Sequence, residues 1–413
     1  VLFRSILLIN HYAGGLKYGM EYRPYYLARE WVEMGHHVTI IGASFSHLRI
    51  QQPRANDDLE CEMVDRIKYI WLKTPVYQST FSRIWNIFVF VLKLQRYAKR
   101  IRELTKPDLV IASSTYPLDI YPARRIAKMT GAKLCYEVHD LWPLSPMVIG
   151  GYSKWHPFIL VMQMAENYAY KHVDKVISLL WNAEQYMREH GLMEGKFKCI
   201  PNGYCKENWE SLNLKANIPE KHRLLFERLE NKITIGFAGG FAASGSLDTL
   251  LKAAVLLREN SNLSFVLVGK GPQQESLEEL VNKYDLDNVF ILPAVKKEQV
   301  PQIISYFDIT FIGGVHSILH KYGTAPNKLT DYMLSVKPIV QAIDEPNSIV
   351  ERVGCGICIE AENAPLVANA ILKLAGLSKK ERDEMGERGR KYASENLEWN
   401  ILAKQFLNEF AIE

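Results

Sequence analysis

The segment 322–338 carries the side chains best suited to holding an anion. It contains Pro326, Lys328 and Asp331 within six residues. Proline suits the first turn of a helix, where a missing N–H costs nothing, and the free N–H groups of that turn favour a diphosphate. Lys328 adds a cation, and Asp331, one turn further on, could reach ribose hydroxyls. The alternative is a surface helix that happens to start at a proline.

Two glycine-rich turns precede this segment. Gly239 and Gly240 follow an apolar run that starts at Ile233, and Gly269 ends the next apolar run, shortly before Pro272. Glycine lets a ligand approach the backbone closely, and proline suits the start of a helix. Each turn alone is weak evidence, but together they suggest a nucleotide that lies across a sheet.

The N-terminal half has two further loops of interest at the ends of apolar runs. The first, directly after Ile9, contains Gly14 and Gly15; its spacing is not GxGxxG, which argues against a nicotinamide dinucleotide. The second places His139 beside Asp140. A histidine donates or accepts a hydrogen bond near neutral pH, so we expect a substrate contact here. The alternatives are a plain turn, a structural histidine and a capping aspartate.

The elements that must position these loops follow from the apolar pattern. Short β-branched runs alternate with amphipathic stretches, which predicts a doubly wound α/β fold with parallel strands. The pattern is interrupted by a polar stretch, predicted as a hinge near 200–220, and then restarts. We therefore expect domains at 1–203 and 204–385, and a helical segment at 386–413 that packs back toward the first domain. Ligands of such sheets bind at the carboxyl ends of the strands.

The predicted strands are 6–10, 37–42, 67–72, 108–113, 133–137, 175–178, 233–238, 264–268, 289–292, 309–312, 338–341 and 357–359. The predicted helices include 22–34, 120–130, 152–171 and the charged stretch 379–410.

Composition excludes several classes of protein. The 413 residues include 50 Lys and Arg against 46 Asp and Glu, and a net charge of +4 gives no reason to expect nucleic acid. Hydrophobic residues at 48% exclude disorder. Six cysteines are too few for a disulfide scaffold, and the isolated pair Cys355 and Cys358 is expected to be free thiols. Asp285 and Asp287 have Asp-x-Asp spacing but precede a strand, so we predict a solvated turn and no metal.

Targeting patterns predict a cytoplasmic protein. No apolar run reaches about 18 residues, and no secretory signal is evident. Residues 81–104 are apolar with Trp and Phe first and basic later, a pattern typical of a helix that rests on anionic lipid. A core helix with a solvated end explains the same pattern equally well.

Taken together, these segments resemble the GT-B glycosyltransferases of family 4, which are retaining enzymes that use nucleotide sugars. The matching stretches are 9–15, 137–143, 200–203 and 326–333. The first of them and the residues that follow are similar to a bacterial branch used in O-antigen and capsule assembly, which includes fucosamine-type transferases. The resemblance implies two Rossmann-like domains that face a central cleft, the first binding acceptor and the second binding nucleotide sugar.

The resemblance also implies roles for individual residues. Gly14 and Gly15 would pack against the donor diphosphate, and His139 would hold the transferred sugar near its reacting carbon. Asp140 is a further catalytic candidate. Lys328 would be catalytic as well as phosphate-binding. Asn327 and Lys328 would bind the phosphates, Asp331 would bind the ribose, and the loop with Ala294 and Val295 would grip the base. The expected nucleotide site also includes Gly239, Gly240, Gly269, Gly323 and Pro326.

Two positions depart from the family pattern. Family members usually have a pair of glutamates in the later motif, and this chain has Gly323 and Asp331 there. Many also have Arg and Lys where this chain has Gly240 and Gly245. Lys328, with neighbouring His320 and Lys321, could supply the missing charge, because cations and helix ends substitute for one another in stabilising a leaving group.

The expected activity is transfer of a hexosyl or N-acetylhexosaminyl group from a UDP-sugar to a polyprenyl-diphosphate-linked sugar, with retention and without metal or cofactor. It would serve lipopolysaccharide or capsule assembly at the inner face of the membrane. Two alternatives remain open. The missing basic pair fits a non-catalytic sugar-nucleotide-binding subunit, and a GT-B epimerase would require several carboxylates that the motifs lack.

Overall fold

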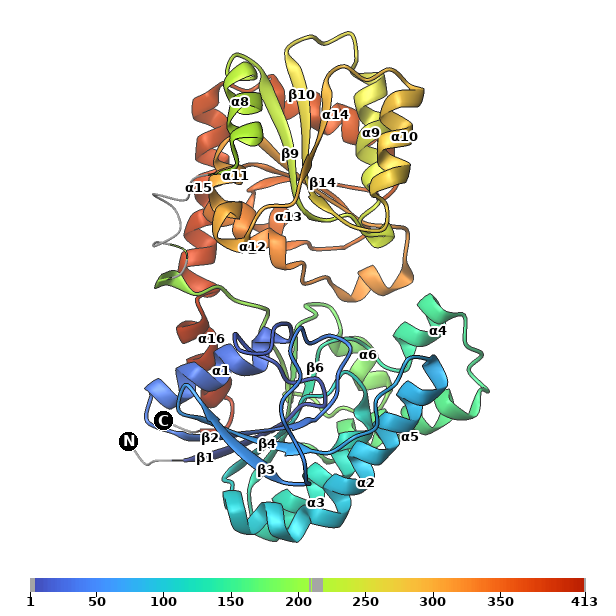
Figure 1. The fold of residues 1–413 in the computed structure, drawn as a ribbon, viewed down its shortest axis with the longest axis vertical. Helices are drawn as coiled ribbons and strands as arrows, with labels where there is room; N and C mark the ends of the chain where they lie inside the picture. Colours follow the sequence, from blue (N-terminus) through green and yellow to red (C-terminus); the bar gives the residue numbers. More distant parts are fainter. Residues whose placement is uncertain (1–3, 208, 210–217, 412–413) are drawn as a thin grey trace. The chain divides into compact units, whose positions relative to one another are not determined.

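A computed structural model describes residues 4–207, 209 and 218–411 (Figure 1). The chain forms two compact units. The N-terminal unit comprises Val1–Gly203 and Trp399–Glu413, and the C-terminal unit comprises Tyr204–Glu398. Within the range 386–413, the residues up to Glu398 therefore belong to the C-terminal unit. Much of the predicted hinge, at 208 and 210–217, lies outside the described residues.

The N-terminal unit is built on an eight-stranded sheet in the order β3-β4-β2-β1-β5-β6-β7-β8. All neighbours are parallel except β3 and β4, which form an antiparallel hairpin through Asp65 and Arg66. The strands are β1 (Ser5–Ile9), β2 (His37–Ala43), β3 (Glu60–Val64), β4 (Ile67–Leu72), β5 (Leu109–Ala112), β6 (Lys133–Val138), β7 (Lys175–Ser178) and β8 (Phe197–Cys199).

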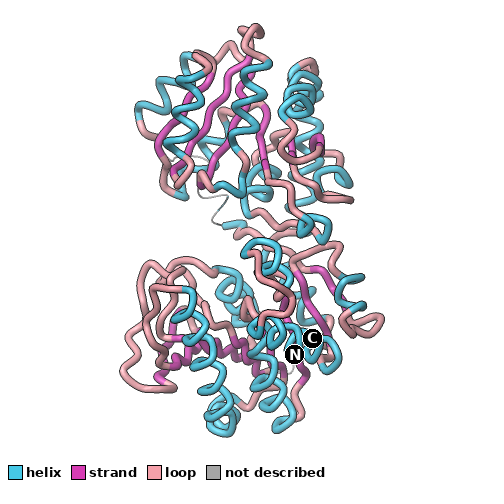
Figure 2. Tube along the Cα trace, turned by 90° about the vertical axis from the view of Figure 1, so that its right-hand side faces the viewer, coloured by secondary structure: helices cyan, strands magenta, loops and turns pink. Residues whose placement is uncertain are grey.

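Helices cover this sheet on both faces, as the tube drawing shows (Figure 2). They are α1 (Tyr22–Glu33), α2 (Thr80–Thr105), η1 (Pro117–Asp119), α3 (Ile120–Thr130), α4 (Leu144–Gly150), α5 (Pro157–His172), α6 (Glu184–Glu189) and α16 (Trp399–Asn408). The C-terminal helix α16 packs on α1 through aromatic rings. Trp399 stacks on Tyr26 with centroids 5.5 Å apart, and the indole N–H of Trp31 donates to the Ala403 carbonyl at 3.0 Å.

The C-terminal unit has a six-stranded, all-parallel sheet in the order β11-β10-β9-β12-β13-β14. Its strands are β9 (Ile233–Gly240), β10 (Leu263–Lys270), β11 (Val289–Pro293), β12 (Ile309–Gly313), β13 (Ile339–Ala342) and β14 (Gly356–Ile359). Its helices are α8 (Glu220–Arg228), η2 (Ala243–Gly245), α9 (Leu247–Leu256), α10 (Gln274–Lys283), η3 (Lys297–Gln299), α11 (Val300–Ser305), η4 (Ile318–Tyr322), α12 (Asn327–Leu334), α13 (Ile349–Val353), α14 (Ala364–Ala375) and α15 (Lys379–Asn396).

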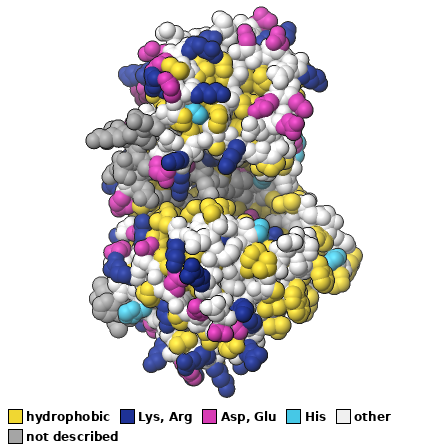
Figure 3. All heavy atoms as spheres, in the orientation of Figure 1, with side chains coloured by type: hydrophobic (Ala, Val, Ile, Leu, Met, Phe, Trp, Pro, Cys, Tyr) yellow, Lys and Arg dark blue, Asp and Glu magenta, His cyan; other side chains and the backbone are white. Residues whose placement is uncertain are grey.

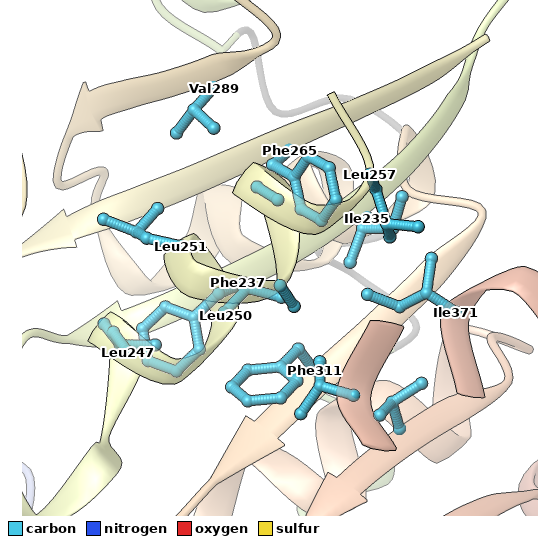
Figure 4. Packing of buried hydrophobic residues seen from close by; sticks show 14 of the residues in the cluster. Ile235, Phe237, Leu247, Leu250, Leu251, Leu257, Phe265, Val289, Phe311 and Ile371 are labelled. Carbon is cyan, nitrogen blue, oxygen red and sulfur yellow. The ribbon is translucent and has the colours of Figure 1, made fainter. Parts of the chain in front are cut away.

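The core of this unit lies between the sheet and the helices α9 and α14 (Figure 4). Phe237, Phe265 and Phe311 come from three strands, and Leu250 and Ile371 come from the two helices. All five are buried, and they hold the strand ends, and so the loops that follow them, in fixed positions.

The structure confirms the predicted fold class and corrects several elements. Strands β3 and β8 were not predicted. The helix predicted at 152–171 begins only at Pro157, because the His156 ring accepts the Phe158 N–H and caps the helix there. A separate helix, α4, precedes it. The stretch 379–410, predicted to be helical, forms the two helices α15 and α16. Pro326 caps α12 instead of lying in its first turn.

No helix among the described residues is both long enough and apolar enough to pass through a bilayer.

Candidate functional site

In the C-terminal unit, Lys328 lies at the start of α12 and faces the end of β9. Its ammonium nitrogen is 4.1 Å from the centroid of the Phe237 ring, and a Cβ built on Gly239 would lie 3.4 Å from it. No carboxylate forms an ion pair with Lys328 in the part of the chain that the structure describes. Burial lowers the pKa of Lys328 from 10.5 to about 8. This is a desolvated cation to which an incoming anion would supply the missing partner.

The backbone beside this ammonium is open. Space is free within 4 Å of the position a Cβ would occupy at Gly240 and at Gly245. Gly269 has a packing reason to be glycine, since its Cβ would lie 1.9 Å from the Gly239 carbonyl oxygen. Lys270, next along β10, pairs in register with Gly240 and is exposed. The predicted glycines thus gather at the carboxyl ends of β9 and β10.

Helix α12 is held against β9 by a hydrogen bond that sequence analysis missed. The Ala238 N–H donates to the Tyr332 hydroxyl at 3.0 Å. One residue earlier, Asp331 has a pKa raised to about 6 by burial, which the charge of Lys297 only partly offsets. The beginning of the helix, with Asn327 exposed and Lys328 half-buried, is therefore fixed beside the glycine turns.

The loop that leads into α12 is anchored by a carboxylate. Glu345 accepts the Thr324 N–H and the Thr324 hydroxyl, each at 2.7 Å, and the Gln341 side chain donates to it at 2.7 Å. Gly323 adopts φ +105°, a conformation that glycine tolerates and other residues rarely adopt. Glu345, which follows β13, was not predicted.

The predicted base-binding loop follows β11 at the edge of the same sheet. Ala294 is exposed and Val295 is half-buried, and the preceding Pro293 carbonyl is 2.9 Å from the His222 ring nitrogen. The loop lies at the carboxyl end of its strand, as do the glycine turns of β9 and β10. The C-terminal unit therefore presents the predicted base-binding and phosphate-binding residues along one edge.

In the N-terminal unit, His139 follows β6 and is held by its neighbours. Its Nε2 is 3.1 Å from the Ser113 hydroxyl and 3.4 Å from a carboxylate oxygen of Glu137. The Ser113 hydroxyl donates to the same carboxylate at 2.6 Å. These contacts place the proton of His139 on Nε2. Its Nδ1 is left for a ligand, and the next residue, Asp140, is exposed.

Glu137 in turn forms a buried ion pair with Arg23 of α1. The Arg23 Nε donates to Glu137 at 2.9 Å, and the two side chains are 4% and 0% exposed. The same guanidinium donates to the carbonyls of Ile200 and Pro201, at 2.9 and 2.6 Å. Arg23 thereby ties the end of β6 to the turn at 200–203, one of the segments that resemble the family.

The charges around His139 favour its protonated form. Burial alone would raise the pKa of Glu137, but Arg23 and the hydrogen bonds from His139 and Ser113 outweigh it and lower that pKa to about 2. Burial works against the protonated imidazole, but Glu137 and, more distantly, Glu21 raise the pKa of His139 above its ordinary value. In that form the ring carries a proton on Nδ1 as well and can donate a hydrogen bond from it.

The glycine loop after β1 is closely packed. Gly14 and Gly15 are buried, and a Cβ on Gly14 would lie 2.0 Å from the Met20 carbonyl oxygen. Arg49 stabilises the loop, since its guanidinium donates a hydrogen bond to the Ala13 carbonyl at 2.7 Å. The loop's own packing therefore requires these glycines, whether or not they also meet a diphosphate.

Hydrogen bonds link this loop to His139. The Asn10 amide donates to the Ser113 carbonyl at 2.8 Å and lies 3.3 Å from the Ser113 hydroxyl, which contacts His139. The carboxyl ends of β1, β5 and β6 are thus joined by side chains. The predicted residues of each unit group at the carboxyl edge of their own sheet.

The sequence contains a signal for the buried ion pair between Glu137 and Arg23. Glu137 is an acidic residue inside an apolar run, and a buried carboxylate requires a cationic partner. Arg23 could have been sought as that partner.

Asp285 and Asp287 lie in a turn before β11, and among the described residues no group of three or more His, Cys, Asp or Glu is placed to hold a metal.

Comparison with known proteins assigns both units. Residues 18–203 match the glycosyl transferase 4-like domain, and residues 220–392 match the glycosyl transferases of group 1. Each of the two units thus matches a glycosyltransferase family. Their matched ranges lie within the two compact units, and the fold is of the GT-B class, with two Rossmann-like domains.

Individual relatives of these glycosyltransferase domains cover nearly the whole chain. The Escherichia coli (strain K12) protein WcaI, which bears the name of a colanic acid biosynthesis glycosyl transferase, is 21% identical over 95% of this chain and 98% of its own. Sucrose-phosphate synthase from Thermosynechococcus elongatus has a TM-score of 0.70 at 17% identity, covering 99% of this chain and 98% of that one. Anabaena HepE, solved with UDP and glucose, has a TM-score of 0.64 at 15% identity, covering 99% of each chain.

Proposed function

We propose that this protein transfers a glycosyl group from a UDP-sugar to a hydroxyl of a lipid-linked sugar, with retention at the anomeric carbon, in the assembly of a bacterial surface polysaccharide. The observation that carries the proposal is the unpaired, desolvated ammonium of Lys328 beside Gly239 and the open backbone at Gly240. The printed names of relatives add support: HepE was solved with UDP, WcaI is named for colanic acid, and WaaG is a glycosyltransferase involved in lipopolysaccharide biosynthesis.

The donor would bind along the carboxyl edge of the C-terminal sheet. Its diphosphate would lie between the Lys328 ammonium and the start of α12, where the helix dipole also favours negative charge. The ribose would reach Asp331, and the base would lie on the loop at Ala294 and Val295. Lys270 is placed to add a second cation near Gly240, at the position where the usual basic pair is absent.

The sugar would be oriented by His139. Since Glu137 and Ser113 occupy Nε2, the ring presents Nδ1, and its raised pKa favours a donated hydrogen bond. Asp140 would accept from another sugar hydroxyl. Arg23 does not need to touch the sugar; it positions Glu137, and so His139.

The reaction would proceed on one face of the sugar. The bond between the anomeric carbon and the leaving diphosphate oxygen breaks, the acceptor oxygen bonds to that carbon from the same side, and the acceptor proton passes to a leaving phosphate oxygen. Lys328 and the helix N–H groups stabilise the charge that develops on the diphosphate. We expect this stabilisation to suffice without a metal ion.

Incubation of the full chain with a series of UDP-sugars and a polyprenyl-diphosphate-linked sugar, in the presence of a chelator, tests the proposal. We expect UDP release that depends on the acceptor and that is lost in His139→Ala, while UDP still binds to that variant. Binding of UDP without any turnover would instead support a non-catalytic subunit. A new sugar nucleotide formed without acceptor would support an epimerase.

A further inference from the structure

The N-terminal unit exposes a group of large apolar side chains on α2, α4 and α5. Ile149 of α4 is 77% exposed, Trp155 before α5 is 72% exposed and Met164 of α5 is 67% exposed. On α2, Trp85 is 56% and Leu92 is 61% exposed. Figure 3 shows hydrophobic side chains gathered at the right of this unit, where Figure 1 draws α4 and α5. We call these five residues and the surface between them the apolar face.

The apolar face lies over helices α2 and α5, which contribute side chains to one core cluster. Ile87 of α2 and Met162 of α5 are buried in that cluster, and Phe88, Val91 and Phe158 pack against it while remaining partly exposed. Both helices therefore carry partly exposed apolar side chains next to the exposed ones. The sequence favoured a lipid-facing helix and a core helix equally at 81–104. In the structure Ile87 and its inward neighbours on α2 are core, whereas Trp85 and Leu92 remain outside.

Cations outnumber carboxylates around this face, where Asp58 pairs with Lys93 of α2. Residues 66–102 contain nine Lys or Arg and no Asp or Glu, and residues 144–165 contain no Asp or Glu. Arg96 and Lys99 of α2 are exposed and form no ion pair among the described residues. Next to Trp155, the Lys154 ammonium lies 5.2 Å from the indole ring centroid. Exposed tryptophan together with unpaired cations matches the boundary of an anionic bilayer, where indole and lysine both find favourable partners.

We propose that the apolar face rests on a membrane surface that bears anionic lipid. The side chains of α4 and α5 enter the boundary between headgroups and acyl chains, and the cations of α2 lie over the headgroups. This goes beyond the proposed reaction, because binding would require neither donor nor acceptor. It also gives the transfer a location, since a lipid-linked acceptor is confined to the bilayer surface.

Sedimentation of the full chain with vesicles tests the proposal in the absence of any sugar substrate. We expect binding to vesicles of phosphatidylcholine mixed with phosphatidylglycerol, at least about tenfold tighter than to phosphatidylcholine alone and weakened by salt. Leu92→Glu and Met164→Glu should each lower that binding by about tenfold or more. Leu256→Glu is the matched control, because Leu256 is 57% exposed on α9 of the C-terminal unit.

A second measurement reports the depth of insertion. Vesicles with brominated acyl chains should quench part of the tryptophan fluorescence, and Trp155→Phe should remove much of that quenching while vesicle binding persists. The proposal is overturned if the wild-type chain does not bind anionic vesicles, or if Leu256→Glu weakens binding as much as Met164→Glu. Self-association that is lost in Met164→Glu, without vesicle binding, would assign the face to a second protein copy instead. Because UDP binding is measured separately in the same variants, failure here leaves the proposed reaction standing.

Discussion

The affinity of the protein for UDP is expected to fall as the pH rises through about 8, because the Lys328 ammonium then loses its proton. Burial lowers the pKa of Lys328 to about 8, and only the protonated form attracts phosphate. If binding requires that proton, the dissociation constant grows in proportion to 1 + 10^(pH − pKa). From about pH 7 to about pH 9 the affinity should therefore fall by ~tenfold, which is ~1.4 kcal/mol.

Two variants isolate the contribution of Lys328. Lys328→Arg keeps its charge throughout this range, so its UDP affinity should not follow the lysine titration. Lys328→Met should bind weakly at every pH and without that dependence. Titration of the nucleotide itself affects all three proteins alike, so the ratio of wild-type to variant affinity removes it.

Isothermal titration calorimetry measures both the affinity for UDP and the number of protons taken up on binding. Affinity is recorded from about pH 7 to pH 9, and repeating the titration in buffers of different ionisation enthalpy gives the protons taken up on binding. We expect uptake near pH 8 to 9 for the wild-type chain and none for Lys328→Arg. An identical pH profile for wild type and Lys328→Arg would refute the reasoning.

Three further outcomes are expected. His139→Ala should lower turnover by ~100-fold while leaving UDP affinity unchanged, as measured by steady-state kinetics and calorimetry; a parallel loss of UDP affinity would contradict its assignment to the sugar. Arg23→Met should lower the free energy of unfolding of the N-terminal unit by ~3–5 kcal/mol in urea, because Glu137 is left buried and unpaired, and adding Glu137→Leu should recover most of the loss; no recovery would contradict that cause. Burial raises the pKa of Glu166 from 4.5 to about 7, so the ionised form is disfavoured in the folded state and stability should decline as the pH rises from about 4.5 to 7. Glu166→Gln should remove that decline and be more stable by up to ~3 kcal/mol at about pH 8, and an unchanged pH profile in thermal unfolding would count against it.

The sheets were largely predictable because their strands are apolar on both faces. β1 and β10, for example, are nearly continuous apolar runs, which is what a parallel strand covered by helices on both sides requires. β3 was missed for the opposite reason. It is the antiparallel edge strand, and its sequence Glu-Cys-Glu-Met-Val alternates exposed and half-buried residues. Its hairpin depends on a turn rather than on burial.

The sequence predicted the loop residues of the candidate site, but not the buried residues that hold them in position. Lys328 and His139 follow elements whose ends are visible in the sequence, and position alone singles them out. Arg23 and Glu137 are 114 residues apart, and their pairing arises only when α1 is laid beside β6. Gly14 was ambiguous for another reason. The sequence could not distinguish a glycine that contacts a ligand from a glycine that the packing of its own loop requires.

The central claim is that this chain moves a sugar from UDP to an acceptor, and a single-turnover experiment tests it most directly. The full chain is mixed with a limiting amount of UDP-sugar and an excess of polyprenyl-diphosphate-linked sugar, then quenched and examined by nuclear magnetic resonance. We predict one glycosylated acceptor for each UDP formed, with the anomeric configuration of the donor kept. Inverted product, or UDP that forms without glycosylated acceptor, would contradict the account.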